Sequence, residues 1–381
     1  MKSHKHLFEK ITSFENLLEA ARKAQKGKRF KPATARFNLD LEKNLLNIQA
    51  ELHSGAYRHG SYQNFVIRDP KQRLISAAPY RDRVVHHALC NIIEPLFDKT
   101  FIHDSYACRK GKGTHAAMER YSRFARKNRF VLKCDIQKYF QSVDHEILLG
   151  MLSKKIRCPP TMALINEIIQ SRVDNSIVQY FLGDDLFSPY QRLRGLPIGN
   201  LTSQFFGNLY LNGFDHFIKE QLRRHHYVRY VDDFVVFGNN SQELQGVSDC
   251  MVAYLSGLRL RLHPKKCRVY RTADGVSFLG FRIFPTHRLL DKGNALRMRR
   301  KLKRWQIMYA DGDIDSEYIH PRIQSWVAHA SYGNTHRLRK RLLEKTVFKR
   351  DEAENNVGRL VEQYGGERPL RQPQQQQPGQ S

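Results

Sequence analysis

The feature that most constrains the fold is a run of apolar residues interrupted by two adjacent aspartates. Residues 227–237 read Tyr-Val-Arg-Tyr-Val-Asp-Asp-Phe-Val-Val-Phe, and the two aspartates are Asp232 and Asp233. Neighbouring carboxylates in an apolar setting repel each other and lose hydration unless something compensates them. A divalent cation at the turn of a β-hairpin would compensate them, because hard cations such as magnesium prefer oxygen ligands. An exposed Asp-Asp turn stays open as the alternative, since a Tyr-x-Asp-Asp string also arises by chance.

A third candidate aspartate stands at the end of another apolar segment. Residues 130–136 read Phe-Val-Leu-Lys-Cys-Asp-Ile and predict a buried strand that ends near Asp135. A strand-end aspartate and a pair at a hairpin tip can meet on one sheet. Two metal ions held there could activate a primer 3′-hydroxyl and stabilise a leaving pyrophosphate in an in-line displacement. Taken alone, Asp135 is as readily a helix-capping residue as a metal ligand.

The charge balance of the chain favours a polyanionic partner. Its 381 residues include 64 Lys plus Arg against 37 Asp plus Glu, a formal charge of +27. Such an excess indicates nucleic acid before an acidic membrane, although a basic ribosome-associated protein would share it. The six cysteines form no CxxC pattern, and no apolar run approaches membrane-spanning length. We therefore expect a cytoplasmic protein that makes no contact with a membrane.

The pattern along the chain predicts an α+β fold in four parts. Residues 1–54 form an N-terminal helical extension. Strands and helices alternate irregularly over residues 55–285, with strands near 130–150 and 205–285, and this argues against a doubly wound parallel sheet. Residues 286–350 are helical and strongly basic, which predicts a separate lobe that grips a nucleic-acid backbone. Residues 351–381 are rich in Gln and Pro and predict a polar, disordered tail.

Several motifs follow one another in the order seen in reverse transcriptases. They are Asp135 with Phe140 five residues on, a turn at Gly199, Tyr-Val-Asp-Asp, Lys266 and Phe278-Leu279-Gly280. Over roughly residues 55–345 the chain therefore resembles this superfamily of RNA-directed DNA polymerases. The resemblance implies a right-hand polymerase, with fingers and an antiparallel-sheet palm in residues 55–285 and a basic helical thumb in residues 286–350. It also implies two Mg²⁺ ions and deoxynucleoside triphosphate substrates.

The segment from Gly195 to Gln204 narrows the resemblance. Its sequence, Gly-Leu-Pro-Ile-Gly-Asn-Leu-Thr-Ser-Gln, departs from the Gln-Gly-x-x-x-Ser-Pro of group II intron and retroviral enzymes. It is similar to the Ile-Gly-x-x-x-Ser-Gln of diversity-generating retroelement reverse transcriptases of the Bordetella phage type. Those bacterial or phage-encoded enzymes copy a template-repeat RNA into cDNA with frequent errors opposite adenine. They act with structured RNA and a small basic accessory protein that assembles as a ring.

Three other interpretations stay open at this point. The chain could be a retron-like or antiphage bacterial reverse transcriptase, although the retron elements Asn-Ala-x-x-His and Val-Thr-Gly are missing. A viral RNA polymerase also uses paired aspartates, but the expected gate at Phe140 favours deoxynucleotides. A maturase-like protein could keep the fold and bind RNA without catalysis, although the three aspartates are intact.

The resemblance also implies roles for single positions. Asp135, Asp232 and Asp233 would be catalytic and, together with Ile136, would hold the metal ions. Phe140 would exclude a ribose 2′-hydroxyl, and Arg73 and Ile198 would set fidelity opposite adenine. The nucleotide-binding positions would be Lys71, Arg73, Tyr139, Phe140, Gly199, Gln204 and Lys266. The template or RNA would contact Arg109, Lys110 and Lys112 in a glycine-rich loop and Arg299, Arg300, Lys303 and Arg304 in the thumb.

Overall fold

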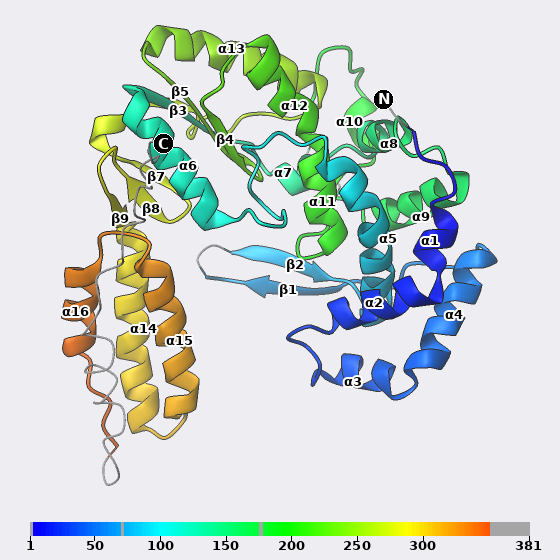
Figure 1. The fold of residues 1–381 in the computed structure, drawn as a ribbon, viewed down its shortest axis with the longest axis horizontal. Helices are drawn as coiled ribbons and strands as arrows, with labels where there is room; N and C mark the ends of the chain where they lie inside the picture. Colours follow the sequence, from blue (N-terminus) through cyan, green and yellow to red (C-terminus); the bar gives the residue numbers. More distant parts are fainter. Residues whose placement is uncertain (1–2, 70–71, 175–177, 351–381) are drawn as a thin grey trace, which may run out of the picture. The chain divides into compact units, whose positions relative to one another are not determined.

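The computed structural model describes residues 3–69, 72–174 and 178–350 (Figure 1). The chain divides into two compact units, Met1–Thr272 and Ala273–Ser381. Each unit is described by itself.

A four-stranded antiparallel sheet forms the centre of the first unit. Its strand order is β4-β5-β3-β6, formed by β3 (Phe130–Asp135), β4 (Tyr227–Tyr230), β5 (Asp233–Gly238) and β6 (Arg268–Arg271). The central strands are rich in valine and phenylalanine, which suit a pleated surface covered on both faces. Phe234 contacts Phe214 of α12 (Asn212–His216), whereas Phe237 contacts Tyr121 of α6 (Thr114–Lys127). Helices therefore cover both faces of this sheet.

The long helix α13 (Ser241–Gly257) also packs on the sheet (Figure 1). The side chain of Asn240 caps it by accepting hydrogen bonds from the backbone nitrogens of Gln242 and Glu243. Such a cap satisfies donors that the first helical turn leaves free. Leu244, Met251 and Leu255 recur on one face of the helix and are fully buried.

An antiparallel hairpin of β1 (Gln63–Ile67) and β2 (Arg73–Ala77) leads into the buried helix α5 (Tyr80–Asp98). The N-terminal helices pack around α5 and share its core, with Leu17 of α2 and Val84 of α5 both fully buried. These helices are α1 (Phe8–Thr12), α2 (Phe14–Ala24), α3 (Pro32–Leu39) and α4 (Leu41–His53). The expected N-terminal helices are thus present, but they are built into the first unit.

The remaining elements of the first unit connect the sheet to the fingers. They are α7 (Tyr139–Ser142), α8 (His145–Ser153), α9 (Pro159–Gln170), α10 (Ser188–Gln191), α11 (Leu201–Tyr210), the π-helical turn η1 (Phe217–Gln221) and the short 3₁₀ turn η2 (Thr272–Asp274), which ends beyond the boundary. The helix α11 runs from the glycine turn to α12 and packs against α5 and α8.

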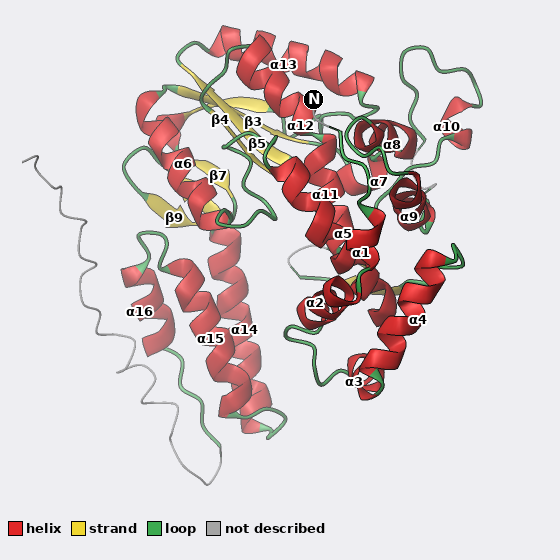
Figure 2. Ribbon diagram, turned by 45° about the vertical axis from the view of Figure 1, so that its right-hand side comes forward, coloured by secondary structure: helices red, strands yellow, loops and turns green. Residues whose placement is uncertain are grey.

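The second unit combines a small sheet with three helices (Figure 2). The strands β7 (Val276–Phe278), β8 (Phe281–Ile283) and β9 (Arg288–Leu290) are antiparallel neighbours. The helices are α14 (Lys292–Ala310), α15 (Ser316–Ala330) and α16 (His336–Glu344). Met298, Leu302, Trp305 and Tyr309 recur at helical spacing on α14 and form the core with Ile319 of α15.

The expected α+β right-hand polymerase, with fingers, an antiparallel palm sheet and a helical thumb, is confirmed, but one boundary differs. The division falls after Thr272 and not after residue 285. The reason is that β7–β9 are tied to the helices, because the backbone nitrogens of Asp291 and Asn334 donate to the carbonyls of Gly280 and Arg288. The tail 351–381 and Lys71 lie outside the described residues. Among the described helices, none is long and apolar enough to cross a membrane.

Candidate active site

Strand pairing brings the three aspartates together. In the register of β3 and β5, Asp135 lies directly opposite Asp233. Tyr230 pairs with Asp233 across the β4–β5 hairpin, so Val231 and Asp232 form a two-residue turn. The backbone nitrogen of Ile136 donates to the carbonyl of Asp232 at 3.2 Å and fixes this turn against the end of β3. The predicted meeting of a strand-end aspartate and a hairpin-tip pair is therefore present.

The turn itself carries backbone strain at Val231. Its φ is 58°, in the left-handed region that β-branched residues rarely adopt. Hairpin turns with a positive φ at the first central position usually place glycine there. A residue held in this region costs on the order of 1–3 kcal/mol and persists only where its surroundings fix it.

Arg229 supplies much of that surrounding support. It is fully buried, and its Nη1 donates to the Val231 carbonyl at 3.1 Å. Its Nε and Nη2 donate to the two carboxylate oxygens of Asp215 at 2.7 and 2.6 Å, and Nη1 also donates to Asn208 at 3.2 Å. Burial alone would lower the pKa of Arg229, but the charge and hydrogen bonds of Asp215 outweigh burial and raise it. A cation fixed in the core therefore holds the carbonyl of the catalytic turn.

Burial and mutual repulsion act on the ionisation of the aspartates. Burial raises the pKa of Asp233 to about 7; Lys133 opposes this rise, whereas Asp135 and Asp232 add to it. Burial also raises the pKa of Asp232, again with help from the charge of Asp135. The Oδ1 of Asp233 is buried without a hydrogen-bond partner, and its nearest cation is the Nζ of Lys133 at 3.9 Å.

These carboxylates have the chemistry of a divalent-cation site. In the described part of the chain, no three His, Cys, Asp or Glu side chains close around a single metal position. Instead, Lys266 donates to Oδ1 of Asp135 at 2.9 Å. Repulsion between carboxylates favours such lysine contacts. The buried Oδ1 of Asp233 and the raised pKa values fit a site that a cation would complete, with Asp135, Asp232 and Asp233 as its ligands.

The expected gate position lies next to this cluster. Phe140 is half-buried, and a Cβ at Gly207 of α11 would lie 3.3 Å from Cε1 of its ring. The neighbouring Tyr139 is buried, and its hydroxyl donates to the carbonyl of Gly207 at 2.5 Å. The prediction that Tyr139 binds nucleotide is therefore corrected for its side chain, because the ring lies in the core and supports α11.

The glycine turn is bound to the fingers hairpin. The backbone nitrogen of Ser76 in β2 donates to the carbonyl of Ile198 at 3.0 Å, and Nδ2 of Asn200 donates to the carbonyl of Ser76 at 2.8 Å. Gly199 has φ 111°, and a Cβ there would lie 2.9 Å from Cγ2 of Ile75. A residue other than glycine would thus be strained in backbone and in space at this position.

Arg73 and Gln204 occupy exposed positions near the two ends of this contact. Arg73 begins β2 and is exposed, and its charge lowers the pKa of Asp232 against the effect of burial. Gln204 is exposed on α11. Arg73, Ile198, Gly199 and Gln204 thus lie on segments that meet, and their nucleotide roles stay predictions.

The glycine-rich loop does not present Arg109 to a template. Its side chain is only 8% exposed, and Nε pairs with Asp98 at 2.6 Å. Its Nη1 donates to the carbonyls of Ile102 and Ser105, and its Nη2 to the carbonyl of Asp98. The prediction for Arg109 is corrected, because intramolecular bonds occupy the whole guanidinium. Lys112 donates to the carbonyl of His103 at 3.0 Å, whereas Lys110 is exposed.

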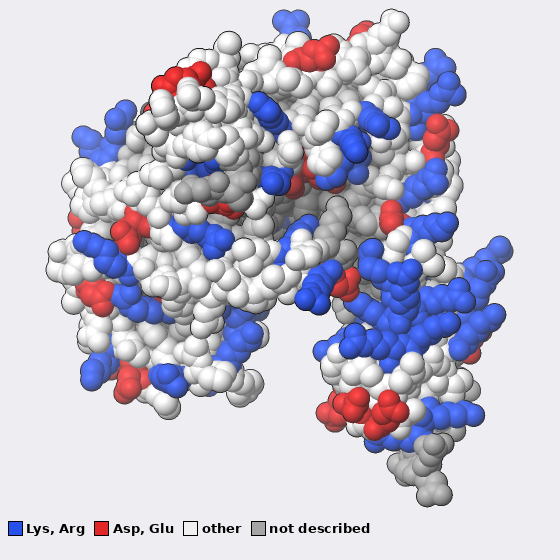
Figure 3. Space-filling view, turned by 180° about the vertical axis from the view of Figure 1, so that it is seen from behind, with Lys and Arg blue, Asp and Glu red and all other residues white. Residues whose placement is uncertain are grey.

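The four cations expected to contact RNA in the thumb all lie on α14 and are exposed. They are Arg299, Arg300, Lys303 and Arg304. Lys and Arg side chains crowd one face of the second unit (Figure 3). This exposed charge fits contact with a phosphate backbone.

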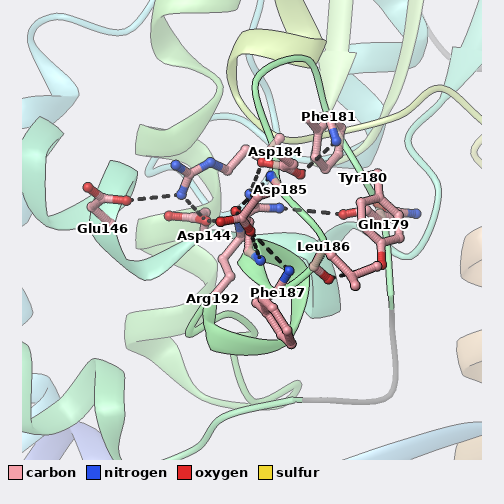
Figure 4. A network of polar contacts seen from close by, with 12 residues as sticks. Asp144, Glu146, Gln179, Tyr180, Phe181, Asp184, Asp185, Leu186, Phe187 and Arg192 are labelled. Atoms are coloured by element: carbon pink, nitrogen blue, oxygen red, sulfur yellow. Dashed lines mark hydrogen bonds and ion pairs between the residues drawn. The ribbon is translucent and has the colours of Figure 1, made fainter.

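A polar network that the sequence did not predict holds residues 178–193 (Figure 4). Asp144 is fully buried, caps α8 through the Ile147 nitrogen, and pairs with Arg259 at 2.7 Å. Arg192 pairs with Asp184 at 2.5 Å and lies 3.5 Å from Asp144. The network anchors this segment to α8, away from the aspartate hairpin in its bonding.

The fold and the aspartate hairpin define a palm that catalyses nucleotidyl transfer. A family model described as "Reverse transcriptase (RNA-dependent DNA polymerase)" matches residues 67–283. The chain belongs to this family of RNA-directed DNA polymerases, whose members use divalent metal ions, and the predicted enzyme class is confirmed.

Relatives at low identity agree with this family. Protein YkfC of Escherichia coli is 24% identical over 320 residues, which are 72% of this chain and 81% of YkfC. The group II intron-encoded protein LtrA of Lactococcus lactis is 23% identical over 46% of this chain, and nuclear intron maturase 4 of Arabidopsis thaliana is 24% identical over 45%. The matched regions are 28% of LtrA and 20% of the maturase. Telomerase from Candida albicans in complex with a TWJ fragment of telomeric RNA superposes with a TM-score of 0.46 at 13% identity, over 81% of this chain and 56% of that one.

Proposed function

We propose that this reverse transcriptase makes adenine-mutagenic cDNA from a template-repeat RNA, as part of a diversity-generating retroelement. The observation that carries the proposal is the hydrogen bond from Ser76 to Ile198, which joins the strand of Arg73 to the glycine turn. One segment would contact the triphosphate and the other the templating base pair. A pocket formed by these two segments is a place where pairing opposite adenine can be loosened. The Ile-Gly-x-x-x-Ser-Gln pattern of residues 198–204 supports this subtype.

In the proposed mechanism, Asp135, Asp232 and Asp233 hold two Mg²⁺ ions, which when bound supply charge for activating the primer hydroxyl and the leaving pyrophosphate. The Phe140 ring excludes a ribose 2′-hydroxyl and selects deoxynucleotides. Arg73 offers a planar fork of donors to the triphosphate. Lys266, which donates to Asp135, carries the positive charge expected near the leaving group.

Primer extension tests the catalytic part of the proposal. The wild type and the double variant Asp232→Asn plus Asp233→Asn are compared on an RNA template with Mg²⁺. We expect extension by the wild type alone, with deoxynucleotides preferred over ribonucleotides. Equal extension by the two proteins would exclude the assignment of these aspartates, and preferred ribonucleotide incorporation would favour an RNA polymerase.

Sequencing of the cDNA tests the mutagenic part. Arg73→Ala and Ile198→Ala are expected to change errors opposite adenine more than the overall rate. Val66→Ala is the matched control, because Val66 is 47% exposed on the other strand of the same hairpin. Adenine errors that match the wild type in both test variants would contradict the proposal. Errors without any adenine bias in the wild type would favour a retron-like or antiphage enzyme.

A maturase-like RNA-binding role is the second candidate, because two of the relatives are named as intron proteins. Under that alternative, the Asp232→Asn plus Asp233→Asn variant would keep its biological activity. The mutagenic proposal also includes a basic, ring-forming accessory protein, which should co-purify with the chain and the template-repeat RNA from the native source.

A further inference from the structure

A groove of about 650 Å³ runs between α14 and α15 in the second unit. Its floor is apolar, with Met298, Trp305 and Met308 from α14. Its walls carry four cations, Arg297, Lys301, Arg304 and Arg322, and the rings of Tyr318 and Trp326. Among the described residues that line it, none is acidic. Only Arg304 belongs to the set of thumb cations singled out from the sequence.

The aromatic side chains of this groove are held in place. The guanidinium of Arg322 lies 3.5 Å from the centre of the Tyr318 ring, and its Nη1 donates to the Tyr318 carbonyl at 2.6 Å. The indole nitrogen of Trp326 donates to Oδ1 of Asn294 at 2.9 Å, which satisfies the donor and orients the ring. Tyr318 is 37% exposed, so it offers ring surface to a ligand. Rings and guanidinium planes fixed beside cations form a stacking platform for nucleobases.

The neighbouring groove gives an internal comparison. A second groove of about 540 Å³ lies between α14 and α16 and includes Arg299, Lys303 and Arg341. Its described lining contains five Lys or Arg residues and no aromatic ring. Cations alone bind phosphates of any nucleic acid, whether paired or unpaired. The presence of rings therefore distinguishes the α14/α15 groove.

We propose that the α14/α15 groove binds an unpaired segment of RNA, with bases stacked on Tyr318 and Trp326 and phosphates paired with the surrounding cations. In a duplex each base is stacked between its neighbours, whereas unpaired nucleotides can turn a face toward aromatic side chains. A protein partner for an apolar floor ringed by four cations would have to be acidic, and it would leave the oriented rings without a role. This assignment depends on the RNA-binding nature of the family and not on mutagenic copying.

Intrinsic fluorescence gives a direct test, because the two tryptophans of the chain, Trp305 and Trp326, both line this groove. The full chain is titrated with a 12-nucleotide oligouridylate and with a blunt RNA duplex of the same length, without nucleotides or metal. We expect the single strand to quench the tryptophan signal and the duplex to leave it largely unchanged. Anisotropy of the same labelled RNAs measures binding anywhere on the protein. Because no polymerisation is measured, this test can fail while primer extension succeeds, and the reverse.

Substitutions locate the binding. Tyr318→Leu should weaken oligouridylate binding about 5- to 150-fold, the range for removing one base–aromatic stack. Tyr332→Leu is the matched control, because Tyr332 is a 44% exposed tyrosine of the same unit outside the groove lining. Arg341→Gln in the other groove should weaken single strand and duplex alike. The proposal is overturned if oligouridylate binds without quenching, if the duplex quenches equally, if an acidic peptide displaces no RNA signal but alone quenches the tryptophans, or if Tyr318→Leu behaves as Tyr332→Leu.

Discussion

Replacing Arg229 by methionine should separate the stability of the palm from its chemistry. The substitution leaves the fully buried Asp215 with Tyr227 as its remaining side-chain donor in the network, at 2.7 Å. Breaking a buried ion pair from one side costs about 3–5 kcal/mol of unfolding free energy. It also removes the charged hydrogen bond to the Val231 carbonyl, a bond of about 1.5–3 kcal/mol. If that bond is needed to hold the strained turn during catalysis, kcat falls about 10- to 150-fold in molecules that remain folded.

Two further variants distinguish positioning from folding. Arg192→Met removes another largely buried arginine, 7% exposed, whose bonds to Asp184 and Asp144 do not reach the hairpin. It should lower stability comparably and leave kcat unchanged. The double variant Arg229→Met plus Asp215→Asn removes the unpaired charge, so it should recover stability but not kcat.

The measurements are urea unfolding and single-nucleotide incorporation at a temperature where circular dichroism shows every variant folded. Nucleotide KM should change little, because Arg229 is buried beneath the turn. The reasoning is refuted if the double variant recovers kcat together with stability, or if Arg192→Met lowers kcat as much as Arg229→Met does.

Three other predictions concern ionisation and space. Because burial raises the pKa of Asp233 to about 7, protons should compete with Mg²⁺ below that pH, weakening apparent Mg²⁺ affinity up to about tenfold per pH unit; Mg²⁺ titrations of primer extension from pH 5.5 to 8 would contradict this if affinity stayed flat. Burial lowers the pKa of His86 to about 3, so its contribution to stability is full above pH 6.5 and is lost as pH falls, by about 2.7 kcal/mol at pH 4.5; urea unfolding should show a shallower acid dependence for His86→Phe, and an unchanged slope would disprove it. Gly199→Ala should cost about 1–3 kcal/mol, because its φ is positive and its Cβ meets Ile75, and adding Ile75→Ala should restore part of the loss in the same unfolding assay; a Gly199→Ala protein as stable as the wild type would refute it.

The sequence predicted features that local pattern determines. The apolar runs around Asp135 and Asp233 define two strands, and the two-residue turn between Tyr230 and Asp233 follows from the same pattern. Other features depend on partners far along the chain. Arg109 reads as a free loop cation, but its partner Asp98 lies at the end of α5, and only the path of the loop brings them together.

The supporting shell of the site was likewise beyond local pattern. Arg229 occupies a strand position between apolar residues, which signals a buried charge but does not identify Asp215 as its partner. Tyr139 and Phe140 are adjacent aromatic residues, and packing against Gly207 alone decides that the first is buried and the second is half-buried. The thumb boundary depends on hydrogen bonds between β7–β9 and the helical segment, which no periodicity reveals.

The link between the fingers and the glycine turn has a consequence for diversification by engineering. The bond from Ser76 to Ile198 joins main-chain atoms, so it does not depend on which side chain either residue carries. Asn200 is the side chain that must be retained, because its amide bridges to the carbonyl of Ser76 and accepts from the nitrogen of Ala78. Residues 73 and 198 can therefore be randomised together in a combinatorial library while the frame that presents them persists. Selection from such a library would tune which base is miscopied independently of whether the polymerase folds.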